Sequence, residues 1–105
     1  IAMLRGLRAS HCVTADDLPH SSDKKIVAVI EESCTREGIF SNKMVSGAYH
    51  DSLFIAEFAP MGMIFVPSRK GISHDPAEYT DMDDIVLGTE VLTDTLLTLS
   101  NSKEI

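Results

Sequence analysis

One short segment constrains the fold more than any other part of this 105-residue chain. From Met61 to Val66 every residue except Gly62 is apolar, and the run lies between Pro60 and Pro67. A short, continuous apolar run with a proline at each end is typical of a strand covered on both faces, as in a mainly parallel sheet. The sequence therefore predicts a central strand over 61–66 with other elements packed on either side.

An amphipathic helix is predicted before this strand. Ile26, Ile30 and Cys34 recur at helical spacing, whereas charged residues fall largely on the other positions. Ser22 is the expected N-cap, and Gly38 is expected to end the helix. A second, short and heavily buried helix is predicted from the cap residue Asp51 onward, after a small-residue turn.

A last helix is predicted after the strand. Thr80 and Asp83 form a capping-box variant, and acidic residues fill the first turn, where the helix dipole favours them. The apolar residues expected on its buried face are Ile85, Leu92, Leu96 and Leu99.

The element order helix, helix, strand, helix indicates the α/β class. We expect one segment over 1–105, a partial layer of a mainly parallel sheet with flanking helices. Because one strand cannot make a sheet, an unlike partner segment is also expected. The chain begins at Ile1 rather than at methionine, which fits a fragment as well as a complete product.

Charge and composition narrow the partners. The formal net charge of −7 argues against binding to nucleic acid or to an anionic membrane, since both require clustered basic residues. No apolar run is long enough to span a bilayer. Cys12 and Cys34 match no metal-binding or disulfide framework, so a soluble, reduced, cytoplasmic protein is expected.

The loop after the predicted strand is the natural place for chemistry, because ligands of open α/β sheets bind beyond the carboxyl ends of the strands. His74 lies in this loop, 24 residues after His50 (74 − 50), a spacing that fits no local metal motif. By itself a lone loop histidine is most often solvated. Asp51 and Glu78 are metal ligands by residue type, but a cap and a loop acid explain them as well.

Other residue types give weaker signals. The acidic cluster at the start of the last helix is explained by the helix dipole, and no serine lies in a nucleophile-elbow frame. His11 and His20 have no partner that the sequence suggests.

Three segments carry a family resemblance, in order and in spacing: SGAYHDS at 46–52, MGMIFVPS at 61–68 and GISHDPAEY at 71–79. They resemble signatures of the metal-dependent amidohydrolase family that includes N-carbamoyl-L-amino-acid hydrolases, allantoate amidohydrolases and ureidoglycolate amidohydrolases. The likeness is strongest over 43–100 and corresponds to the C-terminal part of the catalytic domain.

The resemblance implies a site. His74 matches the last metal ligand, and His50, with the turn Gly47, Ala48 and Tyr49, matches the loop that lines the substrate pocket. His50 is expected to donate a hydrogen bond to the substrate or to the developing oxyanion. The remaining ligands and the glutamate base are expected from the rest of the catalytic domain, which would act as the chain's partner.

The same resemblance implies two divalent ions, zinc or manganese, a small ureido substrate and a homodimeric complete enzyme. Tyr49 replaces a commoner glycine and looks more like the ureidoglycolate branch, although a side chain that only packs explains it equally well. Two further hypotheses stay open: a metallopeptidase or aminoacylase segment, and a non-catalytic α/β module.

Overall fold

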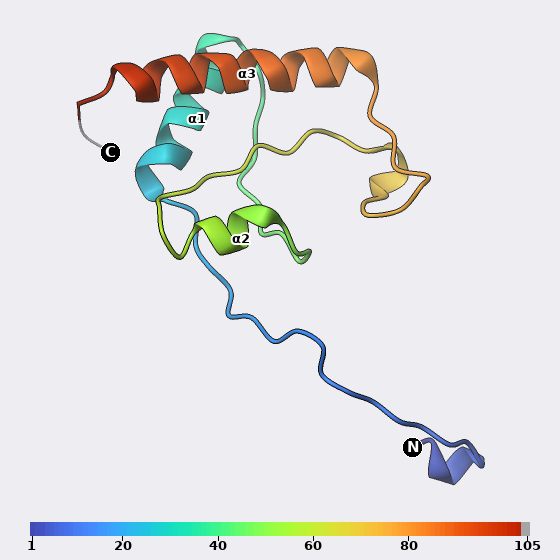
Figure 1. The fold of residues 1–105 in the computed structure, drawn as a ribbon. Helices are drawn as coiled ribbons and strands as arrows, with labels where there is room; N and C mark the ends of the chain where they lie inside the picture. Colours follow the sequence, from blue (N-terminus) through green and yellow to red (C-terminus); the bar gives the residue numbers. More distant parts are fainter. Residues whose placement is uncertain (104–105) are drawn as a thin grey trace.

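A computed structural model describes residues 1–103, and its regular elements in that range are all helical (Figure 1). In chain order they are η1 (Met3–Arg5), α1 (Lys24–Arg36), α2 (Asp51–Ile55), η2 (Arg69–Gly71) and α3 (Met82–Asn101). The first 22 residues form an arm that leads away from the other elements. None of the described helices has the length and apolar character needed to cross a membrane.

Helix α1 lies where the pattern predicts it, but its cap is different. The Oδ1 atom of Asp23 accepts hydrogen bonds from the backbone N–H groups of Lys25 and Ile26, at 2.9 and 3.0 Å. The N-cap is therefore Asp23 and not Ser22, whose hydroxyl instead lies 3.8 Å from the sulfur of Met61. The predicted end at Gly38 is confirmed, because this glycine adopts the left-handed conformation (φ 70°) just after the last turn.

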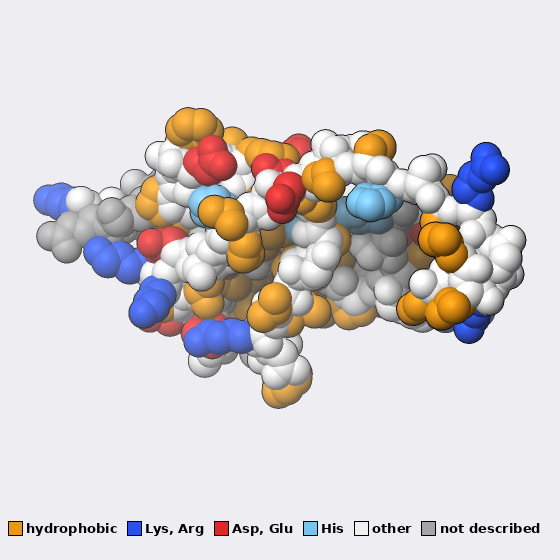
Figure 2. All heavy atoms as spheres, turned by 90° about the horizontal axis from the view of Figure 1, so that it is seen from below, with side chains coloured by type: hydrophobic (Ala, Val, Ile, Leu, Met, Phe, Trp, Pro, Cys, Tyr) orange, Lys and Arg blue, Asp and Glu red, His pale blue; other side chains and the backbone are white. Residues whose placement is uncertain are grey.

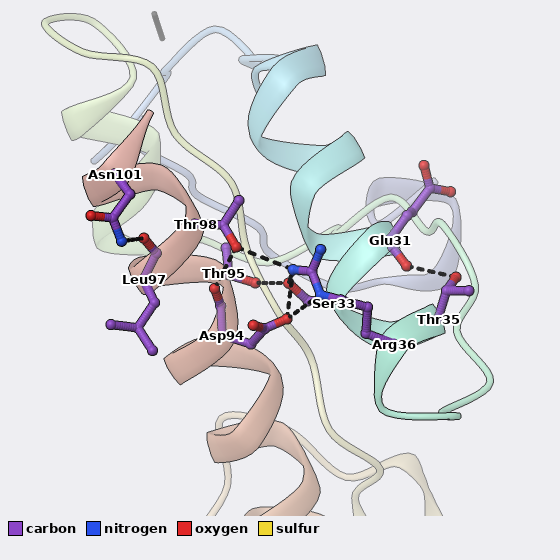
Figure 3. A network of polar contacts seen from close by, with 9 residues as sticks. All are labelled: Glu31, Ser33, Thr35, Arg36, Asp94, Thr95, Leu97, Thr98 and Asn101. Atoms are coloured by element: carbon purple, nitrogen blue, oxygen red, sulfur yellow. Dashed lines mark hydrogen bonds and ion pairs between the residues drawn. The ribbon is translucent and has the colours of Figure 1, made fainter. Parts of the chain in front are cut away.

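Polar side chains join α1 to α3 (Figure 3). Ser33 is completely buried, and its hydroxyl oxygen accepts a hydrogen bond from Thr95 at 3.2 Å. Beside this pair, the Arg36 guanidinium donates to Asp94 Oδ2 from Nε at 3.0 Å and from Nη2 at 2.7 Å. The same Nη2 donates to the Thr98 hydroxyl at 3.1 Å. The crossing of the two helices is thus fixed by directional bonds.

These bonds select a face of α3 that the apolar pattern does not predict. Val91 and Thr95 are the buried residues of the helix, whereas Ile85, Leu92 and Leu96 are 42%, 47% and 56% exposed. The buried face is therefore shifted by about one residue from the predicted one. The shift arises because Thr95, the residue that bonds to Ser33 of α1, precedes Leu96 by one position. The capping box is also wrong: the N-cap is Asp81, which makes no side-chain cap bond.

Residues 61–66 form no strand, and within residues 1–103 the predicted sheet is absent. The physical reason is the lack of a neighbour: the described backbone makes only one hydrogen bond with this segment, from Asp23 N–H to the Met61 carbonyl at 2.7 Å. The segment contacts both α1 and α3, but the predicted cover on both faces is wrong: residues 61–64 are half-buried, and Phe65 and Val66 are 42% and 39% exposed. A Cβ on Gly62 would lie 2.5 Å from Ile26 Cγ2, and a Cβ on Gly88 of α3 would lie 2.5 Å from Val66 Cγ1.

Little apolar surface is buried. The only buried hydrophobic residues in the described part are Cys34 and Val91, and α2, predicted to be heavily buried, has no buried residue. Figure 2, which views the molecule from below, shows hydrophobic side chains at many places on that face. The accessible surface is 8952 Å², whereas about 5,800 Å² is typical of a folded monomer of 11.5 kDa. The radius of gyration is 18.4 Å, against about 13 Å for a compact chain of this length. Cys12 is exposed and Cys34 is buried, and the two are not bonded to each other.

The contact between Arg36 and Asp94 predicts a pH-dependent stability. The hydrogen bonds from the Arg36 guanidinium, and secondarily from Ser33, lower the pKa of the Asp94 carboxyl below its ordinary 3.8. A carboxyl with a depressed folded-state pKa stabilises the fold above its unfolded-state pKa, and this contribution is lost as the pH falls through the folded-state value. We therefore expect wild type to melt at a higher temperature than Asp94→Asn at pH 7, with the gap closing below about pH 4.

Thermal melting followed by circular dichroism at both pH values measures this gap. Asp17→Asn, in the exposed arm, is the matched control and should melt like wild type throughout. A gap between wild type and Asp94→Asn that is the same at low and neutral pH would contradict the ion-pair explanation.

Candidate active site

Two of the predicted site residues, His50 and His74, lie next to each other. Their ring centroids are 5.4 Å apart, with the ring planes at 77° in an edge-to-face arrangement. The ring of His50 also contacts Phe65, at 5.7 Å between centroids. The chain thus brings together two imidazoles that are 24 residues apart in sequence and that no local motif connects.

His50 is fixed by the start of α2. It is the N-cap residue, in an extended conformation (φ −139°, ψ 154°), and its carbonyl accepts a hydrogen bond from Leu53 N–H at 3.0 Å. The helix predicted to begin after an Asp51 cap therefore begins one residue earlier, and Asp51 lies in the first turn. The ring Nε2 of His50 lies 2.8 Å from the hydroxyl of Ser46.

The segment before His50 is a tight turn. The hydroxyl oxygen of Ser46 accepts a hydrogen bond from the backbone N–H of Ala48 at 3.3 Å, which bends the chain around Gly47. Gly47 and Ala48 are exposed, and Tyr49 is half exposed at 50%. The three residues predicted to line a pocket thus lie at the surface beside His50, and their role stays a prediction.

His74 lies at the far end of a loop that is closed at its base. Arg69 N–H donates to the Tyr79 carbonyl at 2.8 Å, and the Arg69 guanidinium lies 4.2 Å from the centre of the Tyr79 ring. The Ser68 hydroxyl also donates to the Ile72 carbonyl. Asp75 then accepts a hydrogen bond from Ala77 N–H at 2.8 Å. The loop therefore has its own internal structure.

The backbone of His74 adopts the left-handed conformation, with φ 56°. This conformation is uncommon for a residue other than glycine, and such residues are concentrated at functional sites, where the surrounding structure holds them. Lys70 has the same φ, at a position where η2 is irregular. An unusual backbone at the predicted ligand is consistent with a site, and it was not visible in the sequence.

The described residues do not complete a metal centre. No group of three or more histidine, cysteine, aspartate or glutamate side chains lies close enough together within residues 1–103 to hold an ion. Glu78 and the acids at the start of α3 are not gathered around His74, and His11 and His20 lie in the exposed arm. Any ion held by His74 would therefore need further ligands.

Sequence reasoning missed three contacts that shape this region: the Ser46 hydroxyl near His50, the edge-to-face contact of Phe65 with the same ring, and the stacking of Arg69 on Tyr79. The first had a weak signal, a serine four residues before a histidine in a turn. The other two join segments whose approach depends on tertiary structure.

The chain was compared with known proteins. A family model described as peptidase family M20/M25/M40 matches residues 10–98. A ureidoglycolate hydrolase of Arabidopsis thaliana is 44% identical over 88 residues, covering 84% of this chain and 18% of that protein. An allantoate amidohydrolase of Bacillus subtilis is 37% identical over 100 residues, covering 95% of this chain and 24% of its own length.

An N-carbamoyl-L-amino-acid amidohydrolase of a Pseudomonas strain is 39% identical over 80 residues, covering 76% of this chain and 19% of that enzyme. The chain thus spans about a fifth of the length of these relatives. The resemblance inferred from the three motifs is confirmed, and the matched range extends it toward residue 10. The chain belongs to the peptidase family M20/M25/M40.

Proposed function

We propose that this chain forms part of the catalytic domain of a metal-dependent amidohydrolase that hydrolyses the C–N bond of a ureido or carbamoyl compound. The observation that carries the proposal is the pairing of His50 with His74, which lies in the sequence shared with ureidoglycolate and allantoate hydrolases. Ureidoglycolate is the substrate we favour, because the relative with that name from Arabidopsis thaliana keeps 44% identity over 88 residues, whereas an N-carbamoyl-L-amino-acid amidohydrolase that is 46% identical matches only 67 residues.

The roles of the residues follow from their chemistry. His74 offers a neutral imidazole nitrogen, a common ligand of zinc and manganese, and its loop is held at the base by Arg69 and Tyr79. His74 would hold one of two divalent ions, which when bound would supply a water of lowered pKa and would polarise the scissile carbonyl. His50 donates a hydrogen bond to the carbonyl oxygen as negative charge develops there. The turn Gly47, Ala48 and Tyr49 lines the pocket beside it.

The rest of the catalytic domain supplies what these residues lack. One imidazole cannot hold two ions, and residues 1–103 contain no further cluster of ligands. Segment 61–66 supports the same conclusion. It contacts α1 and α3, but its backbone makes only one hydrogen bond with the described residues. We propose that this segment becomes the strand of an α/β sheet when strands from outside residues 1–103 pair with it, and that the whole enzyme is a homodimer.

The name of the matched family favours a second candidate, a peptidase or aminoacylase that cleaves a peptide or acyl-amino bond. Both candidates need the same kind of metal site, so His74 does not separate them. Substrate preference does: the amidohydrolase proposal requires turnover of a ureido compound, and the peptidase alternative requires turnover of a dipeptide or N-acyl amino acid.

A chimeric enzyme tests the proposal. The chain replaces the matching segment of the Arabidopsis thaliana ureidoglycolate hydrolase, to which it is 44% identical over 88 residues. We expect the chimera to release product from ureidoglycolate when loaded with zinc or manganese, and the 105-residue chain alone to show no turnover. Metal-dependent turnover by the purified chain alone would contradict the proposal, as would a folded, metal-loaded chimera that hydrolyses only dipeptides or nothing.

Replacing His74 tests the metal role. In the chimera we expect His74→Ala to lower kcat/KM by about 100-fold or more, because even residues outside the ligand shell change affinity or activity by about 10–100-fold. The bound metal, measured by elemental analysis, should fall with it while the circular dichroism spectrum is kept. His11→Ala, in the exposed arm, is the control and should behave like wild type. Full metal content and full activity in His74→Ala would show an ordinary loop histidine.

Replacing Tyr49 tests substrate choice. The phenol occupies pocket volume and adds one hydrogen-bonding group, and discrimination of this kind is worth roughly 1–3 kcal/mol. We expect Tyr49→Gly to lower kcat/KM for ureidoglycolate by about tenfold and to favour the bulkier allantoate relative to it. Both substrates are measured on both proteins. A ratio of the two kcat/KM values that changes by less than about threefold would mean that Tyr49 only packs.

A further inference from the structure

The even-numbered residues of segment 61–66 lie against the helices α1 and α3. A Cβ on Gly62 would lie 2.5 Å from a side-chain atom of α1, and a Cβ on Gly88 of α3 would lie 2.5 Å from Val66 Cγ1. Ile64, between the two, lines a hollow together with Val66 and residues of α3. These three residues of the segment therefore share one side.

Two odd-numbered residues of the segment contact other parts of the molecule. The sulfur of Met63 accepts a hydrogen bond from the Ser52 hydroxyl of α2 at 2.8 Å, and Phe65 contacts the His50 ring. Alternation with a period of two is the pattern of an extended strand, in which successive side chains point to opposite faces. Segment 61–66 thus has one face toward α1 and α3 and another toward α2 and the candidate site.

The hollow on the face toward α3 has a volume of about 220 Å³. Its lining residues come from the segment and from α3, and none of them is charged: Ile64, Val66, Ile85, Gly88, Thr89 and Leu92. The one polar side chain, Thr89, already donates its hydroxyl proton to the Ile85 carbonyl at 2.7 Å. A small-molecule site has a few convergent polar groups, which this hollow lacks. It therefore fits apolar side chains.

The backbone beside the hollow determines the shape of its occupant. Within the described residues the backbone of 61–66 makes one hydrogen bond, from Asp23 N–H to the Met61 carbonyl, and the N–H groups of 62–66 have no partner. Burial of unpaired backbone groups is costly. A helix uses its own N–H and C=O groups internally, whereas an extended chain presents them in a row that matches this segment. The occupant that covers the hollow is therefore a strand.

We propose that the hollow beside 61–66 is a docking groove for an extended, uncharged strand from the rest of the catalytic domain. The strand pairs with the backbone of 61–66 and places its alternate apolar side chains on Ile85 and Leu92 of α3. Only the source of the strand rests on the proposed function. The chain spans about a fifth of the length of its relatives, so most of their sequence is available to supply such a strand. The net charge of −7 disfavours a second copy as the occupant.

Amide hydrogen exchange followed by mass spectrometry tests the pairing. The 105-residue chain is compared with the chimera that carries it within the Arabidopsis thaliana ureidoglycolate hydrolase. We expect the amides of 61–66 to exchange like an unpaired peptide in the chain and at least about 100-fold more slowly in the folded chimera. Equally fast exchange in both overturns the proposal. Slow exchange in the chain alone, with a dimer detected by light scattering, would make a second copy the occupant and also overturns it.

Two matched substitutions on α3 test the groove. Leu92 lines it and Leu97 does not, and in the chain the two side chains are 47% and 58% exposed. In the chain we expect Leu92→Asp and Leu97→Asp each to keep the melting temperature within about 3 °C of wild type. In the chimera Leu92→Asp should lower it by about 5 °C or more, because the charge would be buried under the strand. Leu97→Asp should lower it by less than half as much.

A milder variant covers the case in which the Leu92→Asp chimera does not fold. Leu92→Ala then replaces it, with Leu97→Ala as its control, and the same order of losses is expected. Equal losses from the two positions, or no loss from either change at Leu92, overturn the groove.

These measurements need no turnover, so they separate the groove from the proposed function. A folded chimera with slow exchange at 61–66 and no hydrolysis keeps the groove and overturns the proposed function. An active chimera in which 61–66 still exchanges fast overturns the groove and keeps the proposed function. A wild-type chimera that does not fold overturns both, because the chain then cannot take the place of the matching segment.

Discussion

The polar contact between α1 and α3 holds the described part of the chain together. Only Cys34 and Val91 are buried hydrophobic residues there, so burial of apolar surface contributes little to holding the helices. Instead, Ser33 and Thr95 are buried against each other, and Arg36 joins Asp94 across the helix crossing. Hydrogen bonds of this kind are directional, so they fix which face of α3 turns toward α1. The neighbouring apolar side chains of α3, such as Leu92 and Leu96, consequently remain exposed to solvent.

That choice of face also decides where 61–66 lies. The segment passes between the helices, with Gly62 against Ile26 and Val66 against Gly88, and the hollow beside it is lined by apolar side chains such as Ile64 and Leu92. Its extended apolar sequence and almost unpaired backbone are the features of a strand without neighbours, and none of its side chains is buried. The exposed surface supports the proposal that further strands of a catalytic domain pair with 61–66, and the chain spans about a fifth of the length of its relatives.

The candidate site depends on two local structures that are built separately. The start of α2 and the turn at Ser46 fix the backbone of His50. The cation–π contact of Arg69 with Tyr79 closes the base of the loop that carries His74. Phe65, from the segment between them, contacts the His50 ring. Segment 61–66 connects α2, at whose start His50 lies, to the loop that carries His74, and this connection brings the two histidines together. The left-handed backbone of His74 is the one unusual conformation among the predicted site residues, and it lies at the residue predicted to be the ligand.

Local chemistry in the sequence determined the three α-helices, the stop at Gly38 and the family, because periodicity and short motifs act over a few residues, whereas each predicted N-cap was wrong by one residue. It also singled out His50 and His74 as separate candidates. Only the tertiary structure decided that these rings touch, that Ser46 bonds to one of them, and that Thr95 rather than Leu96 faces α1. The strand over 61–66 does not form within residues 1–103, because a strand is defined by backbone hydrogen bonds to a neighbouring strand. The apolar pattern of a segment can predict that it is a strand, but the pattern does not provide the neighbouring strand.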